Sequence, residues 1–155
     1  MNDLSVFASA VTLQGRHVVL EPLALIHHDE LVAATQDGDI WRLWYTTVPS
    51  PEGMRAEIER RLRLQTQGLM LPFAVRRIDT GSVCGMTTYM NIDAANARVE
   101  IGSTWYARSA QRTAINTECK RLLLGHAFER LGCIAVEFRT HWMNHASRAA
   151  IERLG

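Results

Sequence analysis

The sequence lacks most features that would place it outside the ordinary globular class. No apolar run approaches the roughly 20 residues of a membrane span, and the first ten residues have neither the basic start nor the apolar core of a signal peptide. Its three cysteines lie far apart, without the CxxC spacing of a zinc site or a disulfide framework. The formal net charge of +1 argues against a nucleic-acid binder with a broad basic face. We therefore expect a cytoplasmic protein with reduced thiols and no nucleic-acid or membrane partner.

What is present indicates one domain. A chain of 155 residues can bury a substantial core but is short for two domains. Hydrophobic residues make up 47% and charged residues 21%, the balance of a globular protein. We expect a single domain over residues 1–155.

The hydrophobic periodicity changes along the chain and predicts an α+β fold. Alternating, β-branched stretches predict strands, and apolar spacing of three and four predicts helices. Ser50 and Pro51 predict a helix start, with serine as N-cap and proline at the first helical position. The order predicts a mixed, mostly antiparallel sheet flanked by helices, with 134–140 parallel to 99–106 through a helical crossover. The expected strands are 16–23, 71–78, 83–92, 99–106 and 134–140, and the expected helices are 25–36, 51–68, 114–131 and 144–154.

The stretch QRTAIN at 111–116 opens the longest expected helix. The first backbone N–H groups of a helix have no partner within it, and the dipole there favours an anion. Arg112 adds a mobile positive charge. Phosphate-binding turns are usually rich in glycine, and this one has none. From these residues alone, an anion site and an ordinary helix start remain alternatives.

Several motifs in order along the chain resemble the GNAT superfamily of acyl-CoA N-acyltransferases, in its RimJ/RimL-type branch. The opening TLQGRHVVLEPL and the hairpin FAVRRIDTGSVCGMTTY also fit that branch. Its members usually continue with two more strands, so the resemblance implies that the C-terminal strands of the domain are missing and that the domain is truncated. The motifs are Glu100-Ile101-Gly102, Thr104-Trp105-Tyr106, Gln111 to Asn116, Thr117-Glu118-Cys119, Asn144 to Arg148 and Glu152 to Gly155.

The resemblance implies an N-acetyltransferase that uses acetyl-CoA, needs no metal, and acts on a primary amine of a small molecule, an amino acid or a protein N-terminus. Glu100 would activate the amine, and Ser147 would lie near the sulfur of the cofactor. Asn144 would bind the pantetheine arm. A homodimer is compatible with this branch. The remaining cofactor-binding residues would be Thr104, Trp105 and Tyr106 along the arm, and Gln111, Arg112, Thr113, Ala114, Ile115 and Asn116 around the pyrophosphate.

Two departures from the family pattern concern this site. Ala114 and Asn116 replace the usual glycine or alanine positions, and Ile151 stands where many members carry a tyrosine that protonates the departing thiolate. Ser147 or a water would then supply that proton. These departures favour, as an alternative, a non-catalytic CoA-binding or dimerisation module. A phosphate-binding regulatory domain without acyl chemistry is a third hypothesis.

Purely structural roles remain alternatives to the functional ones. Glu100 could be a surface residue facing a cross-strand arginine, Asn144 the N-cap of the last helix, and Ser147 a small packing residue. Glu118 near the start of a helix is expected to offset the dipole.

The aromatic cluster Trp41, Trp44 and Tyr45 is assigned to the substrate-binding wall, with a core anchor as the alternative. His141 and His145 are four residues apart, but no acidic or cysteine ligands cluster with them, so no metal is expected. Cys119 falls among apolar helix residues and is expected to be inert packing.

Overall fold

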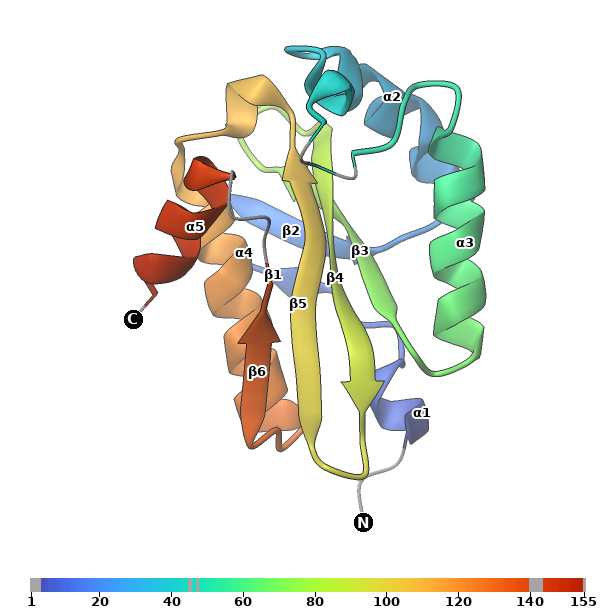
Figure 1. Cartoon of the computed structure of the whole chain (residues 1–155), viewed down its shortest axis with the longest axis vertical. Coiled ribbons are helices and arrows are strands. Elements are labelled where there is room, and N and C mark those ends of the chain that lie inside the picture. Colours follow the sequence, from blue (N-terminus) through green and yellow to red (C-terminus); the bar gives the residue numbers. More distant parts are fainter. Residues whose placement is uncertain (1–3, 45, 47, 140–143, 155) are drawn as a thin grey trace.

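The computed structural model describes residues 4–44, 46, 48–139 and 144–154. Six strands form one curled sheet in the order β1-β2-β3-β4-β5-β6 (Figure 1). All neighbouring strands are antiparallel except β5 and β6, which are parallel. The expected fold class, α+β with a mixed and mostly antiparallel sheet, is confirmed. The strands are β1 Leu13–Gln14, β2 Val18–Pro22, β3 Leu71–Arg77, β4 Val83–Asp93, β5 Arg98–Tyr106 and β6 Ala135–Phe138.

Helices lie at both flanks of the sheet. In Figure 1, α4 and α5 lie to the left of β5, α2 lies at the upper right, and α3 runs down the right-hand side. In the described part of the chain, no helix combines the length and apolar character that a membrane span requires. The α-helices are α1 Leu4–Phe7, α2 His28–Gln36, α3 Met54–Thr66, α4 Ala114–Gly125 and α5 His145–Glu152; single turns of 3₁₀-helix cover Leu25–His27, Ile40–Arg42 and Arg108–Ala110.

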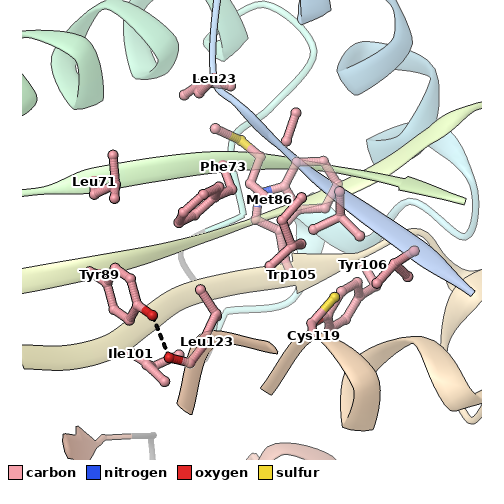
Figure 2. Close-up of a cluster of buried hydrophobic side chains, with 14 of the residues drawn as sticks. Leu23, Leu71, Phe73, Met86, Tyr89, Ile101, Trp105, Tyr106, Cys119 and Leu123 are labelled. Carbon is pink, nitrogen blue, oxygen red and sulfur yellow. Dashed lines mark hydrogen bonds between the residues drawn. The ribbon is translucent and has the colours of Figure 1, made fainter. Parts of the chain in front are cut away.

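The core includes buried residues of the sheet, of α4 and of helices α1, α2 and α3. Tyr89 of β4 points its hydroxyl at the helix and donates a hydrogen bond to the carbonyl of Leu123, as Figure 2 shows. This satisfies the only polar atom of a fully buried ring. The ring of Phe73 meets that of Tyr89 edge-on, with 6.1 Å between centroids. Strand β4 and helix α4 are thus fixed to each other through one buried contact.

Helix α3 begins three residues later than the Ser50–Pro51 pattern predicts. Residues 51–53 form a tight turn, and the first helical residue is Met54. The N–H of Gly53 reaches both the carbonyl of Ser50 (3.1 Å) and its hydroxyl (3.0 Å). The serine therefore caps a turn that leads into the helix, and the prediction of the start was wrong by that turn.

The long helix predicted over 114–131 also changes character. Regular α-geometry ends at Gly125, and His126–Arg130 form a π-helical turn. In this turn the Leu131 N–H bonds the His126 carbonyl, five residues back. Gly132 then adopts a φ of +68°, which ends the helix and turns the chain toward β6.

Candidate functional site

The entrance to α4 is a sharp turn followed by a capped helix start. Arg112 has a φ of +58°, a left-handed conformation that usually favours glycine. The hydroxyl of Thr113 then accepts a hydrogen bond from the Ile115 N–H (3.3 Å) and donates one to the Ala110 carbonyl (2.6 Å). Ala114 and Asn116 lie inside the helix, where their conformation needs no glycine. The absence of glycine therefore leaves the turn intact.

A cleft of about 260 Å³ lies at this helix start. Its walls combine the first residues of α4 with Arg16 and with Arg77, whose charge is paired with Asp79 in the same cleft. The helix dipole and the guanidinium of Arg16 therefore favour an anion there. Arg77 is oriented by Asp79 at 2.9 and 2.8 Å. The residues at this cleft are Arg16, His17, Arg77, Ile78, Asp79, Thr113, Ala114 and Ile115.

The sequence pattern alone did not single out Arg16 and Arg77. Arg16 precedes β2 and Arg77 is the last residue of β3, whereas the motif residues belong to α4. The antiparallel register pairs Val18 with Arg77, which brings the two arginines to the same end of the sheet. Only this pairing, and no local motif, signals their place.

Strands β5 and β6 pair over a short distance and then separate. Their ladder runs from Arg98 to Ile101 of β5, and β5 continues to Tyr106. In Figure 1, β5 passes the tip of β6 and runs on toward the entrance of α4. Among the described residues, no strand pairs with this edge of Gly102–Tyr106. The edge therefore offers backbone groups to an extended ligand.

A bulge re-aims β5 at the same point. Ser103 has a φ of +47°, and the β4–β5 register shifts there so that two β5 residues oppose one β4 residue. Thr104 is held by the hydroxyl of Thr87 at 2.8 Å. The side chains of Trp105 and Tyr106 are buried. Along this stretch the backbone, more than the side chains, is what a ligand can reach.

The side chain of Glu100 is buried beside this edge, at 5% exposure for the residue. Asn91 donates a hydrogen bond from Nδ2 to Oε2 (2.7 Å), and the guanidinium of Arg139 lies 3.7 Å from the same oxygen. A Cβ on Gly102 would lie 3.7 Å from Oε1 and 2.7 Å from the sulfur of Met90. Glycine at this position thus avoids a clash with the Met90 side chain, whereas the distance to the carboxylate would be an ordinary contact. The alternative of a surface glutamate is wrong, although an arginine does lie opposite.

Helix α5 lies across a cleft from β6. Asn144 is its N-cap, and its Oδ1 accepts the Ser147 N–H at 3.1 Å. The capping role expected for Asn144 is therefore confirmed, and it uses only the oxygen of the amide. A second cleft, of about 480 Å³, separates β6 from α5, and Arg139 connects it to Glu100. This cleft is lined by Phe138, Arg139, Arg148, Ile151 and Glu152.

Ile151 stands at the sequence position where many family members carry a tyrosine. It lines the β6–α5 cleft and brings no hydroxyl to it. Ser147, half-buried one turn earlier in α5, is the nearest hydroxyl of this helix in sequence. Ser147 is not among the residues that line this cleft, whereas the carboxyl group of Glu152 is.

The aromatic cluster is not gathered into one wall. Trp41 is half-buried, with the guanidinium of Arg42 over its ring at 4.8 Å. Trp44 is 73% exposed, and Tyr45 lies outside the described residues. Neither tryptophan lines the two clefts above.

Two other expectations have clear outcomes. Glu118 lies beyond the first turn of α4, and its Oε1 accepts the backbone N–H groups of His17 (2.7 Å) and Val18 (3.0 Å), which fixes the start of β2. Cys119 is fully buried, and burial raises its pKa to about 12, which confirms inert packing.

Within the described residues no group of His, Cys, Asp and Glu is arranged to hold a metal, and His141 lies outside them.

Comparison with known proteins gives a consistent family. Residues 17–155 match the family described as acetyltransferase (GNAT) domain. A Bacillus subtilis (strain 168) protein named "Putative ribosomal N-acetyltransferase YdaF" is 39% identical over 75 residues, which are 48% of this chain and 40% of that protein. A GCN5-related N-acetyltransferase from Brucella melitensis is 35% identical, with a TM-score of 0.80 over 95% of this chain and 67% of its own.

A third neighbour shares the fold at lower identity. Mycobacterium smegmatis RimJ, solved in complex with CoA-disulfide, has a TM-score of 0.76 at 21% identity, covering 96% of this chain and 76% of its own.

Proposed function

Because the chain belongs to the GNAT acetyltransferase family, we propose that it is an N-acetyltransferase that moves an acetyl group from acetyl-CoA to a primary amine. The observation that carries the proposal is the separation of β5 from β6 beside the anion-favouring start of α4. These two features offer an extended edge for a chain-like ligand and a positive end for its phosphates.

The cofactor would lie along these features. The backbone amides from Gln111 to Asn116 would hold the pyrophosphate, with Arg112 beside them and Arg16 adding charge. The edge from Thr104 to Tyr106 would pair with the pantetheine arm. The Nδ2 group of Asn144, whose Oδ1 already caps α5, would donate to that arm.

The residues of this chain would then act on the amine. Glu100 would accept a proton from the acceptor ammonium, since Asn91 and Arg139 hold its carboxylate in place at the strand edge. Acetyl-CoA supplies the thioester carbonyl that the neutral amine attacks. Ser147 or a water would give the proton to the departing thiolate. No covalent intermediate with the enzyme is required.

The name of one relative supports a choice among the candidate acceptors. The Bacillus relative carries a name for ribosomal N-acetylation, so a protein N-terminus stands first among the candidate acceptors. Amino acids and small primary amines follow. Trp41 and Trp44 would serve the acceptor side together with Tyr45.

A transfer assay with radiolabelled acetyl-CoA tests this function. Peptides with different N-terminal residues, free amino acids and small amines would be offered in parallel, and N-acetyl products separated by chromatography. We expect Glu100→Gln to lower kcat by about 10² to 10⁴-fold, the usual contribution of a general base. The matched control is Glu129→Gln, which makes the same change at an exposed glutamate of the turn after α4. Equal loss in both variants, or full activity in Glu100→Gln, would contradict the assigned base.

A second candidate is a CoA-binding or dimerisation module without turnover. The observation in its favour is Ile151, which leaves the β6–α5 cleft without the tyrosine hydroxyl of many members. It predicts tight CoA binding and no N-acetyl product with any acceptor, whereas the enzyme predicts both. A regulatory phosphate-binding domain predicts that free phosphates bind as well as CoA.

A further inference from the structure

The chain has a single lysine, Lys120, and sixteen arginines. Lysine side chains are almost always exposed unless they are paired, yet this one is only 7% exposed and lies in the second turn of α4. A buried ammonium is costly unless it is paired. The partners of the Lys120 amine therefore decide whether its charge is stabilised.

Lys120 has weak partners for a buried cation. Its Nζ donates to Oδ1 of Asn116 (2.9 Å) and lies 5.8 Å from the ring centroid of Phe138. None of the ion pairs found in residues 4–44, 46, 48–139 and 144–154 includes it. The other deeply buried cation, Arg61, has a carboxylate at 2.9 Å from Glu57. Burial lowers the pKa of Lys120 to about 8.

The two contacts of Lys120 belong to two walls of the proposed cofactor path. Asn116 is the last of the residues assigned to the pyrophosphate, and Phe138 lines the β6–α5 cleft. Side chains of a helix lean toward its N-terminus, and the bond to Asn116 directs the amine of Lys120 the same way. The amine thus lies between the helix start and the cleft.

We propose that Lys120 is a self-acetylation site, which takes the acetyl group from acetyl-CoA bound to the same chain. This inference rests on the proposed function for the presence of acetyl-CoA. The neutral amine attacks the thioester carbonyl, a C–N bond forms and the C–S bond breaks. Coenzyme A leaves as the thiol and takes up the proton that the amine loses.

The product fits its surroundings better than the reactant does. Acetylation converts a buried ammonium into a neutral amide, which removes the cost of burying a charge. The amide N–H can still donate to Asn116. A chain whose one lysine lies in this position also has no other lysine that bound or free acetyl-CoA could modify.

The test uses the full chain and mass spectrometry. Wild type and Lys120→Arg would be incubated with acetyl-CoA, with and without excess desulfo-CoA, and digested with a protease that cleaves at basic residues. Acetylation of Lys120 blocks cleavage after it and yields a peptide from Thr113 to Arg121 that is heavier by one acetyl group. Calorimetric titration of CoA into the same two proteins runs in parallel.

We expect label on Lys120 at a rate more than about tenfold above that of the α-amino group, because a bound donor is presented at high effective concentration. Desulfo-CoA should suppress the label, and Lys120→Arg should bind CoA without being labelled. Binding of CoA with no label on Lys120, or label that desulfo-CoA leaves unchanged, would overturn self-acetylation while the proposed function stands. Absence of CoA binding would overturn both.

Discussion

Replacing Lys120 by methionine should stabilise the protein at neutral pH. Methionine keeps a flexible side chain of similar length in α4 and removes the charge. At about 1.4 kcal/mol per pKa unit, the fall of the Lys120 pKa from its usual 10.5 to about 8 means that the ammonium costs the native state about 3 kcal/mol. Loss of the hydrogen bond to Asn116 destabilises the variant and offsets about 1 kcal/mol of this gain.

The pH dependence separates the charge from packing. Between about pH 8 and pH 10.5 the unfolded chain holds a proton on Lys120 that the native chain has released, so wild-type stability from this group rises with pH. Below that window the full cost is present, and above it none remains. The advantage of Lys120→Met should therefore shrink by about 2 kcal/mol from pH 7 to pH 9.5.

The cysteines change the stability with pH in the opposite direction, so their contribution has to be removed from the comparison. Burial raises the pKa of Cys84 to about 11 and that of Cys119 to about 12, so the unfolded chain loses these protons first and stability falls above about pH 9. Both proteins carry the same thiols, and the difference between their unfolding free energies removes this contribution.

Urea unfolding of both proteins at several pH values measures that difference, after mass spectrometry has shown that the wild-type lysine is unmodified. A difference that does not change with pH would refute the reasoning, because packing and the Asn116 bond do not titrate with Lys120. A wild type more stable at pH 7 than at pH 8.5, relative to the variant, would give the opposite sign and refute it as well.

Three further predictions concern stability and reactivity. Glu118→Ala should destabilise the fold by about 2 kcal/mol, because the buried Val18 N–H loses its acceptor, and Glu118→Gln should lose less than half of this in the same urea experiment. Arg76→Ala should cost about 2 kcal/mol, since Glu21 and Glu30 both bond its guanidinium; an unchanged unfolding midpoint would show that the network is not stabilising. The three buried thiols have raised pKa values and should react slowly with Ellman's reagent until the chain is unfolded.

The sheet could be predicted from sequence because each of its longer strands has a recognisable local residue pattern. Alternation and β-branching predicted β3, β4 and β5 to within a residue or two, and the crossover predicted the parallel pairing of β5 with β6. The start of α3 could not be predicted as well, because Ser50 caps a tight turn as readily as a helix.

The site divides in the same way. The helix start and the strand edge carry local patterns, whereas Arg16, Asn91 and Arg139 join the site only through strand pairing and register shifts. Glu118 shows the limit most clearly. Its position in α4 favours a role at the dipole, but its actual partners are backbone N–H groups about a hundred residues earlier.

Calorimetric titration of acetyl-CoA, CoA and 3′,5′-ADP into the purified chain tests the central claim most directly. If the start of α4 and the free edge of β5 bind one ligand together, acetyl-CoA should bind far more tightly than 3′,5′-ADP, which lacks the pantetheine arm. Equal affinity for acetyl-CoA and 3′,5′-ADP would contradict the role of the β5 edge, and no heat with any of the three would contradict the cofactor assignment as a whole.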